Sequence, residues 1–161
     1  MYLKSTPTIS ADQEPIRRQA KEIVGDETKP LKVSELLEHW VFRHLRKTTA
    51  ANASTALDVL KTLAGDCTEH TLLFLALARA SGIPARRVGG VVYGGGNPPL
   101  FAWHAWAEIH DGSQWVSIDP TWDQVFVDAT HLKLSEGSDD WSWVNVVGSL
   151  KIKILDFTSK K

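Results

Sequence analysis

The stretch that decides the fold is residues 101–120, which read FAWHAWAEIHDGSQWVSIDP. Two runs rich in aromatic and β-branched residues flank an Asp-Gly-Ser segment, a pattern typical of a β-hairpin. If the loop is Gly112-Ser113, Trp106 lies opposite Asp119 and His104 lies on the adjacent diagonal. Residues two apart share a face, so the His104 imidazole and the Asp119 carboxylate are predicted to come within side-chain reach. An odd-length loop would put Asp119 on the other face.

The single cysteine, Cys67, stands at the start of an apolar helical pattern. Asp66 is a good N-cap and Glu69 follows three residues later, which approximates a capping box. In the first turn of a helix, backbone N–H groups lack partners and can stabilise a thiolate or the oxyanion of an attacked carbonyl. A lone cysteine is more commonly a small buried hydrophobe. The interpretation of Cys67 as a nucleophile therefore depends on His104 and Asp119 serving as its base and orienter.

Four motifs occur in order between about positions 50 and 123. They are Gly65-Asp66-Cys67, Leu-Ala-Arg-Ala-Ser-Gly-Ile-Pro-Ala-Arg86, Trp103-His104-Ala105-Trp106-Ala-Glu108 and Trp115-Val-Ser-Ile-Asp119-Pro120-Thr121. Together they resemble the transglutaminase-like superfamily. The resemblance implies an α+β fold similar to that of papain-type cysteine proteinases, with N-terminal helices and a nucleophile-bearing helix packed on an antiparallel β-sheet. It also implies Cys67 as nucleophile, His104 as general base and acid, and Asp119 as the residue that orients the imidazole.

One segment departs from the family pattern. Many members carry Val-x-x-x-Ile-x-Tyr after the helix that precedes the cysteine motif, and Val41, Leu45 and Lys47 stand at those positions here. Lys47 leaves the side-chain donor to the oxyanion open. Trp40 can supply an indole N–H, although a tryptophan on a helix face is more commonly part of the core. Trp40 and Trp106 are the candidate substrate-binding residues.

The expected reaction is acyl transfer on a peptide or amide substrate through a thioester, without a cofactor. The resemblance implies peptide hydrolysis, glutamine deamidation or amine cross-linking, and hydrolysis is the default because water is always present. Two alternatives stay open at this point. One is a non-catalytic scaffold or binding domain of the same fold, and the other is an acyl-CoA-dependent acetyltransferase.

A metal site is not expected. Zinc needs three or four ligands held tetrahedrally. His70 would point about 300° around the helix from Cys67, and no second pair at ligand spacing follows in the sequence. His39, His44 and His131 are interpreted as surface or packing residues.

Composition indicates one domain-sized globular unit. The chain has 161 residues, 43% of them hydrophobic, which is ample for one core. Eighteen basic and nineteen acidic residues give a net charge of −1, so no nucleic-acid partner is indicated. No stretch reaches the ~18 apolar residues of a membrane span, and the first residues do not form a signal peptide. The compartment stays open, because one cysteine does not define it.

The remaining organisation is read from periodicity. Residues 1–12 are expected to be loosely ordered, with few apolar anchors, and 13–161 to form a single transglutaminase-like domain that would also suit a longer protein. Helices are predicted over 15–24, from Ser34 to about 45, and over 54–64. Strands are predicted over 85–93, 125–127 and 150–157. Trp141 and Trp143 flank an acidic stretch and are interpreted mainly as local packing residues.

Overall fold

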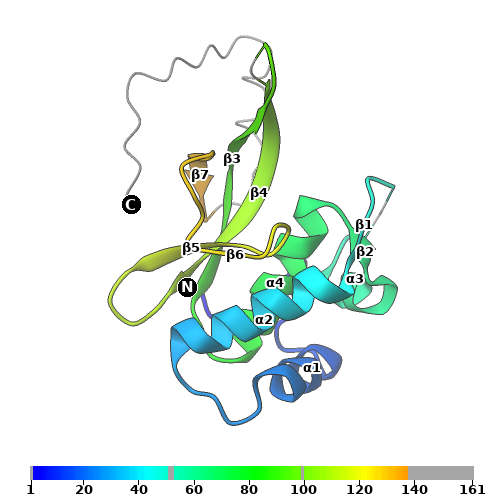
Figure 1. Ribbon diagram of the computed structural model, residues 1–161. Coiled ribbons are helices and arrows are strands. Elements are labelled where there is room, and N and C mark those ends of the chain that lie inside the picture. The colour runs from blue at the N-terminus through cyan, green and yellow to red at the C-terminus, as the bar shows by residue number, and fades with distance from the viewer. Residues whose placement is uncertain (1, 51–52, 99, 138–161) are drawn as a thin grey trace.

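The computed structural model describes residues 2–50, 53–98 and 100–137 (Figure 1). The described helices are α1 (Glu14–Val24), α2 (Pro30–His44), α3 (Ala56–Thr62) and α4 (Cys67–Ala80). The described strands are β1 (Arg46–Lys47), β2 (Ala64–Gly65), β3 (Ala85–Gly95), β4 (Leu100–His110), β5 (Trp115–Asp119), β6 (Gln124–Val125) and β7 (His131–Glu136). Figure 1 shows the helices gathered at one end, with the long β3–β4 hairpin rising away from them. The predicted α+β class is confirmed.

The main sheet has the strand order β6-β5-β4-β3-β7, and its pairings are antiparallel. The β4–β5 hairpin pairs His110 with Trp115. The Asp111 N–H donates to the Gln114 carbonyl across 3.1 Å, which leaves Gly112-Ser113 as the loop. The even loop parity predicted from the sequence is confirmed.

This register decides which side chains meet. Ala107 is paired with Ile118, so one step further along the hairpin Trp106 comes beside Asp119. Side chains alternate between faces along each strand. His104, Trp106 and Asp119 therefore share one face of the sheet, as the sequence predicts.

Helix α4 is the centre of the hydrophobic core. Its Leu73, Phe74 and Leu77 side chains are fully buried, and they belong to one cluster with the strand residues Ile109 and Ile118. Burying a side chain of this size contributes about 1.5–3 kcal/mol. This packing holds α4 against β4 and β5, and so sets the position of its first residue, Cys67, relative to those strands.

The second helix begins earlier than predicted. Ser34 was expected to cap it, but α2 starts at Pro30. Proline suits the first turn of a helix because its missing N–H has no intrahelical partner there. Ser34 lies inside the helix, where its hydroxyl donates to the Pro30 carbonyl across 2.9 Å. The prediction of a Ser34 cap is wrong.

The N-terminal segment has more anchors than its composition suggests. Ile9 and Ala11 are buried in the helical core. The Thr8 carbonyl accepts from the Ala56 N–H across 2.8 Å, at the start of α3. Few as these apolar anchors are, they and the Thr8 hydrogen bond tie the segment to the helices.

Strand β7 was not predicted, and β6 covers only part of the predicted strand at 125–127. The strand predicted over 150–157, together with Trp141 and Trp143, lies outside the described residues. Among the helices that the structure describes, none has the length and apolarity needed to cross a bilayer.

Candidate active site

Cys67 is the first residue of α4, and its surroundings follow from a complete capping box. The Asp66 carboxylate accepts from the Thr68 N–H across 2.8 Å and from the Glu69 N–H, while the Glu69 carboxylate accepts from the Asp66 N–H across 2.9 Å. Gly65 makes this possible, because a Cβ there would lie 2.1 Å from the Glu69 Cβ. The cysteine itself is half-buried.

The cap leaves one backbone donor at the nucleophile. Two first-turn N–H groups, those of Thr68 and Glu69, are used by Asp66. Among the described residues, no acceptor is found for the Cys67 N–H. An oxyanion that forms beside the sulfur could therefore use this N–H without breaking another hydrogen bond.

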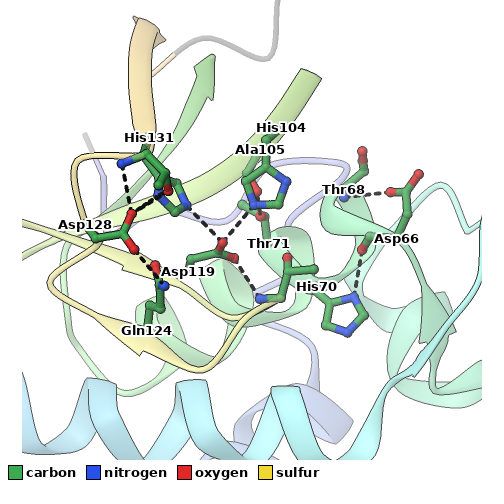
Figure 2. A network of polar contacts seen from close by, with 12 residues as sticks. Asp66, Thr68, His70, Thr71, His104, Ala105, Asp119, Gln124, Asp128 and His131 are labelled. Carbon is green, nitrogen blue, oxygen red and sulfur yellow. Dashed lines mark hydrogen bonds and ion pairs between the residues drawn. The ribbon is translucent and has the colours of Figure 1, made fainter. Parts of the chain in front are cut away.

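His104 and Asp119 form a buried pair. The His104 Nε2–H donates to the Asp119 Oδ2 across 2.7 Å, and the two side chains are 5% and 0% exposed (Figure 2). Burial disfavours the imidazolium, but hydrogen bonds with Asp119 and Cys67 outweigh it and raise the pKa of His104 to about 9. Since Nε2 faces Asp119, Nδ1 is the nitrogen left for Cys67. The structure thus pairs His104 with Asp119 directly, and the influence of Cys67 on the pKa of His104 is consistent with a sulfur near the free ring nitrogen.

Asp119 is held in its ionised form by its neighbours. Burial opposes ionisation, but N–H donors from His104 and His131 outweigh it and hold the pKa of Asp119 well below its ordinary value. Its second oxygen, Oδ1, accepts from the Thr121 N–H across 2.8 Å. A carboxylate with three donors is a fixed acceptor for the imidazole.

His131 is a fourth member of this cluster that sequence reasoning missed. Its Nε2 lies 3.2 Å from the Asp119 Oδ2, and its side chain is fully buried (Figure 2). The interpretation of His131 as a surface or packing residue is therefore incomplete, because β7 carries it to the carboxylate. No local motif marks it. His39, by contrast, has an exposed side chain paired with Asp123, as the sequence indicates for a surface residue.

Two tryptophans enclose the His104 ring. Trp106 lies on one side, with ring centroids 6.1 Å apart at 24°, and Trp122 stacks more closely, at 4.6 Å and 16°. Trp122 is 40% exposed, whereas Trp106 is 1% exposed. Burial of this kind favours a packing role for Trp106 over contact with substrate. Trp122, which the sequence reasoning did not single out, is the tryptophan that faces both the imidazole and solvent.

Trp40 lies elsewhere. It lines a hollow of about 640 Å³ between α1, α2 and α3, together with Leu57 and Leu60, and its ring stacks on His44 at 4.4 Å. The contacts described for Trp40 are with these helices and not with His104 or Asp119.

Three side chains of the site could in principle ligate a metal. The candidate ligand atoms of His104, Asp119 and His131 lie within 4.8 Å of one another. Tetrahedral ligands at zinc distances lie roughly 3.3 Å apart, and the His104–Asp119 contact of 2.7 Å is shorter than that. A metal would have to push this pair apart, so direct hydrogen bonds describe the cluster better.

A half-buried cysteine at a helix N-terminus, linked to a buried His–Asp pair on an antiparallel sheet, defines the transglutaminase-like class of cysteine-centred α+β folds. Residues 17–120, which include Cys67, His104 and Asp119, match the family described as "Transglutaminase-like superfamily". The chain belongs to this superfamily.

Individual proteins are similar to this chain in sequence or in structure. An uncharacterised protein of Haemophilus influenzae is 39% identical over 98 residues, covering 58% of this chain and 26% of that protein. A candidate cysteine protease from Cytophaga hutchinsonii is similar in structure with a TM-score of 0.68 and 25% identity, covering 84% of this chain and 45% of that one. The periplasmic domain of TgpA from Pseudomonas aeruginosa, bound to ethylmercury, is similar with a TM-score of 0.58 and 27% identity. That match covers 76% of this chain and 48% of the TgpA domain. The chain thus spans half or less of the length of these relatives.

Proposed function

We propose that this chain is a cysteine-dependent acyl-transfer enzyme acting on peptide or amide substrates, with hydrolysis as its main outcome. The observation that carries the proposal is the buried hydrogen bond of 2.7 Å between His104 and Asp119, together with the influence of Cys67 on the same imidazole, whose pKa it helps to raise. A scaffold domain would not need this alignment. The relationship to candidate cysteine proteases supports the same class.

The chemistry follows from the positions of these groups. Cys67 passes its proton to His104 and attacks the amide carbon as a thiolate, forming a tetrahedral oxyanion. The Cys67 N–H is placed to stabilise that oxyanion. His104 then donates its proton to the leaving amine, which breaks the C–N bond and leaves a thioester on the sulfur.

The second half of the reaction reverses these roles. His104, now neutral, removes a proton from water, and the hydroxide attacks the thioester carbonyl. The C–S bond then breaks, the acid product leaves, and the proton that His104 took from water returns to the sulfur, so atoms and charges balance over the cycle. An amine in place of water would give transamidation, and a glutamine side chain as the first substrate would give deamidation.

His104 is suited to the acid role by its environment. With its pKa raised to about 9, the ring holds a proton at neutral pH and has one available when the amine leaves. The ionised Asp119 keeps that proton-bearing ring in one orientation, with Nε2 always turned to the carboxylate. The aromatic rings of Trp106 and Trp122 limit its rotation further.

The test compares wild-type protein with Cys67→Ala on an unfolded protein substrate such as casein, with and without methylamine. Hydrolysis predicts new peptide termini that depend on Cys67; deamidation predicts ammonia release, and transamidation predicts methylamine incorporation. A chain that produces none of these above the Cys67→Ala background, at enzyme concentrations that bind the substrate, is a scaffold, and the proposal is then wrong.

A further inference from the structure

The Asp119 carboxylate is shared by two histidines. Its Oδ2 lies 2.7 Å from the His104 Nε2 and 3.2 Å from the His131 Nε2, and Figure 2 shows the oxygen between the two rings. An ionised carboxylate only accepts hydrogen bonds, so each Nε2 must carry the proton. His104 needs that tautomer for its work with Cys67. His131 has no contact with the sulfur that would explain the same arrangement.

A glycine on β3 allows β7 to lie close enough for the contact between His131 and Asp119. β7 is three positions away from β5 in the sheet order, yet the His131 and Asp119 side chains meet across one face of the sheet. Gly90, on β3, lies at an irregularity in the register of the β3–β7 pairing. A Cβ on Gly90 would lie 2.2 Å from the Leu132 carbonyl oxygen and 2.7 Å from the Trp106 ring. Glycine at this position thus allows the backbone of β7 to close over the site.

The far side of the His131 ring is also held. Its Nδ1 lies 3.3 Å from the Thr130 hydroxyl and 3.5 Å from the Asp128 carboxylate, and the Thr130 hydroxyl contacts Asp128 in turn. The ring is therefore fixed from both nitrogens. A side chain that only filled space would not need polar partners at both ends.

We propose that His131 is a positioning residue for the acyl-transfer reaction, which donates its Nε2–H to Asp119 and thereby keeps the carboxylate ionised and aimed at His104. The inference rests on the proposed function, because positioning has meaning only if His104 acts on Cys67. It extends the Cys67–His104–Asp119 arrangement to a fourth residue, from a strand that none of the other three occupies.

The charges around Asp119 fit this role. Among the described residues, the titratable groups seen to act on it are His104 from β4, His131 from β7, Glu38 from α2 and His70 from α4. Glu38 is an acid whose charge would oppose ionisation of Asp119. His70 is fully buried, and burial lowers its pKa. His131 is thus the second direct side-chain donor that stabilises the carboxylate, beside His104 itself.

Three substitutions separate donation from packing. His131→Gln places an amide N–H near the position of Nε2, and His131→Asn carries the same amide one methylene short of Asp119. His131→Phe keeps the ring and removes every donor. His110→Phe, at the far end of β4, is the matched control for loss of a histidine. Far-UV circular dichroism checks that each variant is folded. If His131→Phe is not folded, the comparison of His131→Gln with His131→Asn is sufficient to test the inference.

The readout is the rate of Cys67 alkylation by iodoacetamide as a function of pH, in the complete chain, for wild type, His104→Ala and the four variants. We expect His131→Asn and His131→Phe to react about tenfold more slowly than wild type at pH 7, with the acid limb moved up by about one pH unit. His131→Gln and His110→Phe should stay within about threefold of wild type.

Two results would overturn the inference, in distinguishable ways. If wild type reacts faster than His104→Ala while His131→Asn and His131→Phe follow the wild-type profile, His131 has no positioning role and the proposed function stands. If wild type reacts no faster than His104→Ala, the proposed function fails and this inference fails with it.

Discussion

Asp119 and Glu108 are both buried carboxylates on neighbouring strands of one sheet, and their donors make them chemically different. Glu108, on β4, accepts from Arg86 on β3 across 2.8 Å and from Lys133 on β7 across 2.9 Å. Its side chain is 6% exposed, close to the 0% of Asp119. Both carboxylates therefore collect donors from several strands.

The donors differ in whether they can release a proton. Guanidinium and ammonium groups stay charged over the whole physiological range, so the Glu108 cluster can stabilise the sheet and little else. Imidazole changes its charge near neutrality and has two ring nitrogens, so the Asp119 cluster can pass a proton to a neighbour. Of the two clusters, the Asp119 cluster has such a neighbour, because Cys67 acts on His104 and helps to raise its pKa. Burial and ion pairing alone do not mark a catalytic carboxylate.

The largest effect should come from removing the charge at each carboxylate in turn. Asp119→Asn is expected to lower the rate of acyl transfer by about 10³- to 10⁴-fold, because the amide can hold the imidazole in the wrong tautomer. Glu108→Gln should change that rate by less than about threefold. Initial rates on one substrate measure both variants, and a similar loss in the two would erase the distinction between the clusters.

The next effect is a pH dependence that only the Asp119 cluster should show. His104 must carry a proton to release the amine, so the rate should fall about tenfold per pH unit above about 9. The ion pair with Asp119 also stabilises the fold, fully below the ordinary histidine pKa of 6.5, and this contribution is lost as pH rises through about 9. In Asp119→Asn the basic limb should move down toward 6.5. A limb that stays in place would mean that another group titrates.

Glu38 offers a third comparison, a buried carboxyl that pairs with no cation among the described residues. It is 2% exposed on α2, and burial, with the charges of Asp123 and Asp119, raises the pKa of Glu38 to about 8. The folded state therefore keeps a proton that the unfolded chain releases above about 4.5, and stability should fall as pH rises between these values. Glu38→Gln should match wild type at pH 4 and exceed it by about 2 kcal/mol or more at pH 8.5.

Urea denaturation at the two pH values measures this difference. If the difference in free energy of unfolding between wild type and Glu38→Gln is the same at both pH values, Glu38 is already ionised at neutral pH and this prediction is wrong. The charge of Asp119 acts on Glu38. The rate of acyl transfer by Glu38→Gln therefore also tests whether a nearby charge affects the catalytic site.

The smallest of these effects is the stability change at the other cluster. Glu108→Gln should lower the free energy of unfolding by about 1–3 kcal/mol, because Arg86 and Lys133 lose a buried partner. Both cations still contact Glu136 at the edge of the cluster, which limits the loss. Thermal or urea unfolding measures it, and no loss at all would indicate that Glu136 replaces Glu108 fully.

What the sequence predicts well in this protein is local. The Asp66–Glu69 spacing predicts the capping box of α4, and the two-residue Gly112-Ser113 loop predicts the register that puts His104 and Asp119 on one face. Each depends on residues within a few positions of one another or on a single hairpin. The arrangement could therefore be derived from spacing and parity.

What the sequence did not predict depends on distant contacts. His131 meets Asp119 although β7 and β5 are not neighbours in the sheet, and neither residue carries a signal that points to the other. Trp122 covers His104 because the chain turns sharply after β5, where Asp123 has a φ of 59°. Ile9 is an anchor because it belongs to the same buried cluster as residues of α3 and α4. Such contacts are set by sheet curvature and tertiary packing, which periodicity does not encode.

The most direct measurement is the mass of the protein after brief reaction with p-nitrophenyl acetate, an activated ester that needs no specific groove. If Cys67, His104 and Asp119 act as one unit, a single acetyl group should appear on the Cys67 peptide in wild type and in Glu108→Gln, and should be nearly absent in His104→Ala and Asp119→Asn. Acetylation of Cys67 at equal rates in all four proteins would contradict the claim that Cys67, His104 and Asp119 act as one unit.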